Sequence, residues 1–152
     1  MGDRRLNLER AITAIAGIPV TVSARSSIYE TEPQDIANQP WFLNIVLECR
    51  TTMFPLQLLS RLRAIERDLG RTRGKDVTPK GPRVIDIDIL LYGKSIIRTA
   101  PLTVPHERML ERRFVLEPLV QINPDLRDPR SGRLLSEQLQ ALNGQIVRRI
   151  DE

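Results

Sequence analysis

A chain of 152 residues with 41% hydrophobic side chains is long enough to bury one core, so we expect a single domain over residues 1–152. Its formal net charge of +4 and isoelectric point near 9.8 permit an anionic small substrate or a nucleic acid as partner. The lone cysteine, Cys49, excludes an internal disulfide, and no apolar run reaches the length of a membrane span. We therefore expect a soluble, cytoplasmic protein without membrane association.

The first third of the chain carries one helix signal and two strand signals. Apolar side chains recur at helical spacing over residues 5–17 and predict a first amphipathic helix. Residues 20–29 and 41–51 are rich in β-branched and apolar side chains and predict two strands. Residues 30–40, with two prolines, predict the loop that joins them.

The second predicted strand has two different faces. Phe42 and Asn44 share one face with Val46 and Glu48, whereas Cys49 falls on the opposite, wholly apolar face. We expect that apolar face to pack against helices. An aromatic ring beside an amide is suited to hold a flat heterocycle, although Phe42 and Phe114 could equally belong to the core.

Residues 55–69 give the clearest helix signal, with Pro55 at the start, a leucine-rich stripe and Gly70 as a C-terminal cap. Residues 70–83 then combine several cations with glycines and prolines and hardly any apolar side chain. A loop of this length without its own structure is usually functional or disordered.

Residues 84–92 predict a strand in which two acids alternate with aliphatic residues. Side chains two apart point to the same face, so Asp86 and Asp88 would share one face and Ile87 and Ile89 the other. The following elements are shorter: a strand at 95–97, an irregular stretch at 99–105, a helical turn at 107–112, an apolar segment at 114–119, a helix at 134–142 and a strand at 145–150.

Helices interspersed with short strands indicate an α+β fold. We expect a ferredoxin-like layer sandwich, in which helices pack on a mainly antiparallel sheet.

The paired aspartates indicate metal chemistry. Hard oxygen ligands in small number suit Mg²⁺, which keeps several waters and takes further oxygens from substrate phosphates. The alternative is a half-exposed strand that presents Asp86 and Asp88 to water.

The arginines around the aspartates favour phosphoryl-type transfer. Arg71 and Arg73 lie in the cationic loop, and Arg83 precedes the strand of Asp86 and Asp88. Phosphoryl transfer needs metals, cationic donors and alignment, and a closing loop would exclude water. A solvated charged loop is the alternative. His106 is the only histidine. It either has a functional role or is a turn residue whose ring hydrogen-bonds to the backbone.

Several segments, in the same order along nearly the whole chain, resemble 6-hydroxymethyl-7,8-dihydropterin pyrophosphokinase of folate biosynthesis. They are residues 27–33, 39–44, 65–73, 81–88, 104–106 and 112–114. The resemblance implies an enzyme that moves the β,γ-pyrophosphoryl unit of ATP to the pterin hydroxymethyl group and releases AMP. Members of the family are monomers, and neither a nucleic acid nor a membrane is implied.

The resemblance also implies a role for each site residue. Asp86 and Asp88 would hold two Mg²⁺, while Arg71 and Arg83 would stabilise the transfer. The remaining contacts to ATP would come from Arg63, Glu66, Arg73, Lys80, Ile89, Thr103, His106 and Arg112, and those to the pterin from Thr31, Gln34, Phe42, Asn44 and Phe114.

One departure from the family is that its usual first strand, ending in Gly-Ser-Asn-Leu, has no counterpart before Met1. We therefore expect the first strand to be missing, which would leave a strand edge open for dimerisation. Two alternatives follow: a truncated, weakly active or inactive member of the family, or an RNA-binding α+β module suggested by the basic charge. The second lacks the clustered aromatics of such sheets.

Overall fold

The computed structural model describes residues 3–31, 42–71, 84–142, 144 and 147–150. The chain divides into two compact units, one formed by Met1–Val22 with Cys49–Ile89 and the other by Ser23–Glu48 with Leu90–Glu152. The expectation of a single domain stays a prediction. No helix in the described part of the chain is long and apolar enough to cross a membrane.

The first unit is built on two packed helices. In α1 (Arg4–Ala16), Asp3 caps the N-terminus by accepting hydrogen bonds from the Arg5 and Leu6 N–H groups. α1 packs against α2 (Pro55–Arg71), and at the start of α2 Gln57 Oε1 accepts a hydrogen bond from the Phe54 N–H. Both helices bury one stripe at helical spacing, made of Leu8, Ala11 and Ile15 in α1 and Leu59, Leu62 and Ile65 in α2.

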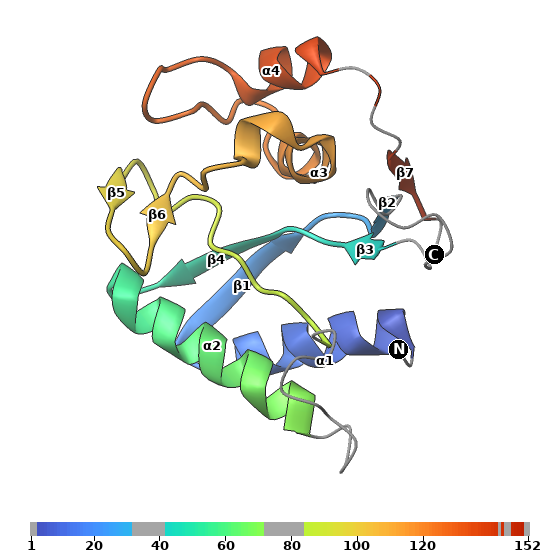
Figure 1. The fold of residues 1–152 in the computed structure, drawn as a ribbon, viewed down its shortest axis with the longest axis vertical. Helices are drawn as coiled ribbons and strands as arrows, with labels where there is room; N and C mark the ends of the chain where they lie inside the picture. Colours follow the sequence, from blue (N-terminus) through green and yellow to red (C-terminus); the bar gives the residue numbers. More distant parts are fainter. Residues whose placement is uncertain (1–2, 32–41, 72–83, 143, 145–146, 151–152) are drawn as a thin grey trace. The chain divides into compact units, whose positions relative to one another are not determined.

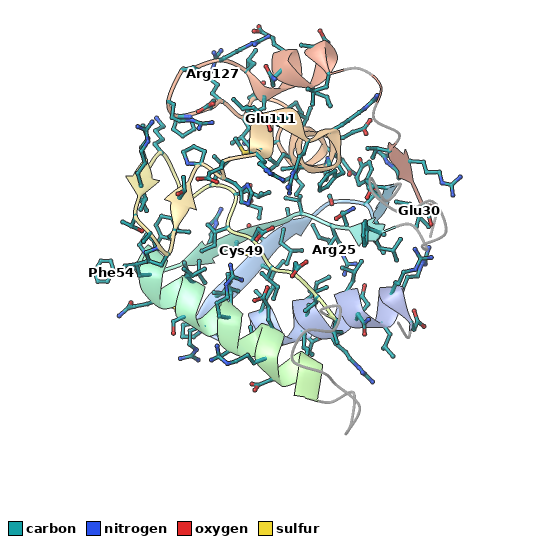
Figure 2. All side chains as sticks on the ribbon, in the orientation of Figure 1. Arg25, Glu30, Cys49, Phe54, Glu111 and Arg127 are labelled. Carbon is teal, nitrogen blue, oxygen red and sulfur yellow. The ribbon has the colours of Figure 1, made fainter. Side chains whose placement is uncertain are left out.

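β1 (Val20–Arg25) and β4 (Leu47–Thr51) form a two-stranded sheet, and the division between the units falls within both strands. Cys49 of β4, labelled in Figure 2, is exposed, and so are its neighbours Glu48 and Arg50. The expectation that Cys49 lies on a buried apolar face is therefore wrong. In a sheet of two strands, side-chain alternation does not ensure that either face is covered.

The second unit contains a three-stranded sheet with β2 (Tyr29–Thr31) at its centre (Figure 1). β2 pairs antiparallel with β3 (Phe42–Asn44) on one side and with β7 (Val147–Arg149) on the other. Glu30 and its partner in register, Arg148, form an ion pair with 2.6 Å between oxygen and nitrogen.

The helices of the second unit enclose its core. β5 (Ile97–Arg98) and β6 (Thr103–Val104) form an antiparallel pair, followed by the 3-10 turn η1 (Met109–Glu111), α3 (Arg113–Ile122) and α4 (Leu135–Ala141). α3 packs against both α4 and β2. The buried cluster consists of Met109, Val115, Leu116, Leu119 and Leu135.

The α+β class is confirmed, because helices pack together with small antiparallel sheets. The predicted helices at 5–17, 55–69 and 134–142 correspond to α1, α2 and α4. The predicted strand at 41–51 is two strands, β3 and β4, and residues 45–46 between them belong to neither. The missing first strand stays a prediction.

The strand predicted over residues 84–92 is wrong, because none of these residues belongs to a strand (Figure 1). The physical reason lies in the backbone of Ile87. Its N–H donates to Glu66 Oε2 at 2.6 Å, and its carbonyl accepts from Arg63 Nη1 at 2.7 Å. Side chains of α2 therefore take the places that a neighbouring strand would fill in a ladder.

An ion pair between a buried carboxylate and an exposed arginine organises the loop before α4. Asp128, only 2% exposed, accepts hydrogen bonds from the backbone N–H, Nε and Nη2 of Arg130. The loop is closed by the Gly132 N–H, which donates to the Asp128 carbonyl at 2.8 Å. The hydrogen bonds from Arg130 lower the pKa of Asp128, and they outweigh burial, which acts in the opposite direction.

The substitution Asp128→Asn should lower the free energy of unfolding by about 1–3 kcal/mol at pH 7, because charge-assisted hydrogen bonds are lost. A lowered pKa in the folded state contributes stability above the unfolded pKa, and this stability disappears as pH falls through the folded pKa, below 3.8. Urea unfolding of both proteins between pH 7 and pH 3 measures the difference. A difference that does not shrink on acidification would contradict this assignment.

Candidate functional site

The two aspartates occupy an irregular segment of the first unit, and their exposure alternates with that of their neighbours. Asp86 and Asp88 are exposed, Ile87 is half-buried, and Ile89 is buried. The alternation expected for a strand thus persists without strand pairing. Two exposed carboxylates separated by one residue are hard oxygen donors, so their chemistry fits a divalent cation such as Mg²⁺.

Arg63 and Glu66 form a bracket around Ile87. Glu66 Oε1 lies 2.9 Å from Arg63 Nη1, and the other carboxylate oxygen, Oε2, accepts from the Ile87 N–H. The Glu66 side chain is only 9% exposed, compared with 38% for Arg63. Both carboxylate oxygens of Glu66 are therefore used within the protein. The family resemblance implied only contacts to the nucleotide for these two residues.

The other candidates of the first unit are less fully described. The backbone of Arg71 ends α2, and the side chain of Ile89 is buried. Four predicted site residues lie outside the described residues: Gln34, Arg73, Lys80 and Arg83.

In the second unit, the structure brings together three of the residues predicted to contact the pterin. Thr31 and Phe42 are direct partners in the β2–β3 register, and Asn44 Nδ2 donates to Thr31 Oγ1 at 3.0 Å. Thr31 is 6% exposed, whereas Phe42 is 52% exposed. An accessible ring therefore lies beside a polar pair whose geometry is fixed by a hydrogen bond.

Phe114 and Arg112 lie together at the start of α3. The Arg112 guanidinium carbon is 5.4 Å from the centroid of the Phe114 ring, within the range of a cation–π contact. Phe114 is half-buried and packs against the core cluster of its unit. One residue predicted to bind phosphate thus contacts one predicted to bind pterin.

His106 and Thr103 lie close together along the chain in the second unit. Thr103 is in β6, and His106 follows the cis Val104–Pro105 bond. His106 Nδ1 accepts from the Arg108 N–H at 3.2 Å, and the His106 N–H donates to the Leu90 carbonyl at 2.9 Å. A neutral His106 ring therefore carries its proton on Nε2. The backbone contacts match the turn role that the sequence left open.

A polar network behind β2 was missed by sequence reasoning. Gln121 Oε1 accepts from the Tyr29 hydroxyl at 2.8 Å and from the Ser27 N–H at 3.0 Å. Gln121 Nε2 donates to Ser27 Oγ, and the Arg149 guanidinium lies 5.6 Å from the centroid of the Tyr29 ring. The network ties β2 to α3 and β7. Its partners are more than 90 residues apart in the sequence, so no local pattern could reveal it.

Comparisons with known proteins agree with the predicted resemblance. The family described as 7,8-dihydro-6-hydroxymethylpterin-pyrophosphokinase matches residues 1–124. A Bacillus subtilis protein named 2-amino-4-hydroxy-6-hydroxymethyldihydropteridine pyrophosphokinase is 45% identical over 80% of this chain and 72% of its own length. A Pseudomonas aeruginosa protein of the same name is 41% identical over 93% of this chain and 85% of its own length.

A longer relative also matches. The "Folic acid synthesis protein fol1" of Pneumocystis carinii is 42% identical over 87% of this chain, which spans 17% of that protein's length. The match to the family pattern covers every candidate site residue, from Thr31 to Phe114. The chain therefore belongs to the 7,8-dihydro-6-hydroxymethylpterin-pyrophosphokinase family.

Proposed function

We propose that this chain transfers the β,γ-pyrophosphoryl unit of ATP to the hydroxymethyl group of 6-hydroxymethyl-7,8-dihydropterin in folate biosynthesis. The hydroxymethyl oxygen forms a bond to the β-phosphorus, the bond from that phosphorus to the α-phosphate oxygen breaks, and AMP and a proton leave. The observation that carries the proposal is the family match over residues 1–124, which include all candidate site residues. We place the reaction in the cytoplasm, where ATP and Mg²⁺ are abundant.

The exposed carboxylates support the metal part of the proposal. Asp86 and Asp88 would hold two Mg²⁺, which when bound neutralise phosphate charge and align the reacting oxygens. The chain's own task is to present both carboxylates on one side of the segment, as the alternating exposure of residues 86–89 indicates.

The nucleotide side of the proposed site is cationic. Arg71 and Arg83 would stabilise charge on the transferred group, because guanidinium groups bind phosphate oxygens in pairs. The guanidinium of Arg112 and the ring of His106 lie in the second unit and would bind further phosphate oxygens. The other proposed contacts to the nucleotide are Arg73, Lys80, Ile89 and Thr103.

The pterin side would use stacking and directed hydrogen bonds. Phe42 offers an exposed ring, and Phe114 would cover the opposite face of the heterocycle. Asn44 would bond the edge of the pterin, since its amide is already oriented by Thr31. The backbone at Thr31 and Gln34 would complete the contacts to the pterin.

The RNA-binding alternative loses its support, because it was suggested only by the basic isoelectric point and the α+β pattern, and the chain belongs to a pyrophosphokinase family. Turnover measurements distinguish a fully active enzyme from the alternative of a truncated, weakly active or inactive member of the family. A monomer remains our expectation, with a dimer through an open strand edge as its alternative, and sedimentation equilibrium distinguishes the two.

Incubation with Mg-ATP and 6-hydroxymethyl-7,8-dihydropterin should yield AMP and the pyrophosphorylated pterin in equal amounts, measured by chromatography. Formation of ADP only, or no turnover by folded protein, would refute the proposal.

Replacing either metal-binding carboxylate should lower kcat by about 100-fold or more, because a ligand of the Mg²⁺ that would neutralise the phosphate charge is lost. The variants are Asp86→Asn and Asp88→Asn, which keep the side-chain size and remove the charge. Asp125→Asn, at an exposed carboxylate of the second unit, is the matched control and should keep wild-type activity. Equal activity in all three variants would remove the aspartates from the site.

The substitution Phe42→Ala should raise KM for the pterin about tenfold, which corresponds to about 1.4 kcal/mol of stacking and burial, and should leave KM for ATP unchanged. Steady-state kinetics with each substrate varied measures this split. Phe54→Ala is the matched control, because Phe54 is 72% exposed and projects from the start of α2 (Figure 2). Equal pterin KM values for the two variants would exclude stacking on Phe42.

A further inference from the structure

We propose that Arg63 and Glu66 are positioning residues that fix the two aspartates, instead of contacting the nucleotide themselves. This inference rests on the proposed pyrophosphoryl transfer and deepens it. It assigns to one turn of α2 the task of holding the metal-binding segment in a fixed geometry.

The hydrogen bonds of the bracket fall on both peptide units that flank Ile87. The N–H bonded by Glu66 belongs to the peptide that joins Asp86 to Ile87. The carbonyl bonded by Arg63 belongs to the peptide that joins Ile87 to Asp88. One contact therefore restrains the backbone of each aspartate, and both contacts come from residues three apart on the same helix.

These contacts are important for the orientation of the two aspartates, because the segment has no strand pairing. Residues 84–92 are outside any strand, so a β-ladder does not fix the direction in which Asp86 and Asp88 point. The bonds are also short, at 2.6 and 2.7 Å, and each has a charged partner. Charge-assisted bonds of this kind are about twice as strong as neutral ones.

The bracket leaves little of Glu66 for a ligand. One carboxylate oxygen is bonded to Arg63 and the other to Ile87, and the side chain is largely buried. Arg63 also offsets the negative charge of Glu66, which would otherwise add to the repulsion between the aspartates and any incoming phosphate. Groups that orient metal ligands typically change metal affinity or activity by about 10–100-fold when they are removed.

The test separates positioning from nucleotide contact. Glu66→Gln retains one acceptor oxygen for two donors, so the bracket cannot form completely. We expect the Mg²⁺ concentration for half-maximal activity to rise about tenfold and kcat to fall, with KM for ATP at saturating Mg²⁺ within about twofold of wild type. Glu137→Gln is the matched control, because Glu137 forms an exposed ion pair with Arg133 at 3.8 Å and should change none of these values.

Two further measurements do not depend on turnover. Electron paramagnetic resonance of Mn²⁺, with a non-hydrolysable ATP analogue present, should show about tenfold weaker Mn²⁺ binding by Glu66→Gln than by the control. Amide hydrogen exchange followed by NMR should show a protected Ile87 N–H in the wild type, and exchange about tenfold faster in Glu66→Ala. Circular dichroism checks that each variant is folded. If Glu66→Ala does not fold, Mn²⁺ binding by Glu66→Gln tests the positioning role instead.

The inference is overturned by a raised KM for ATP with unchanged Mg²⁺ and Mn²⁺ dependence, which would make Glu66 a nucleotide contact. It is also overturned by unchanged Ile87 exchange in folded Glu66→Ala. If wild-type protein forms no AMP, the proposed function fails, yet the exchange and Mn²⁺ results still support or overturn the bracket.

Discussion

The geometry of the first unit depends on how the backbone of Ile87 is satisfied. Buried backbone groups need partners, and here they are supplied by an acid and a base on α2 in place of a neighbouring strand. The same peptide segment carries the two carboxylates on which the proposed chemistry depends. Helix formation, ion pairing and the orientation of Asp86 and Asp88 are thus linked, because a disturbance of α2 reaches the carboxylates through the hydrogen bonds of Arg63 and Glu66 to Ile87.

The second unit follows a different principle, since its candidate residues Thr31, Phe42 and Asn44 are placed by the register of a sheet. β2 is the central strand, and its position between β3 and β7 sets Thr31 opposite Phe42 and within a hydrogen bond of Asn44. The Gln121 network fastens β2 to α3, the helix that begins beside Phe114. A polar pair oriented by the fold can select a ligand edge at low entropic cost, because its side chains are already ordered before the ligand arrives.

Sequence patterns predicted the elements that depend on residues close together in the chain. The helices α1, α2 and α4 were predicted because apolar stripes and caps lie within a few residues of one another. α3 was predicted only as an apolar segment, because Pro118 and a run of buried side chains obscure its period. The strand over residues 84–92 was wrong and the bracket was missed for one reason: the partners of Ile87 lie 21 and 24 residues away. The exposed alternation of Asp86 and Asp88 was nevertheless predictable, since it follows from extended geometry alone.

The exposure of Cys49 has a practical consequence for studies of assembly. The chain has one thiol, and that thiol lies at the surface of β4. Because disulfide formation requires an accessible thiol, this residue is a place where oxidation in air can couple two copies covalently. A doubled mass that disappears with dithiothreitol would therefore report a disulfide between two copies, whereas one that persists with dithiothreitol would represent association between folded surfaces.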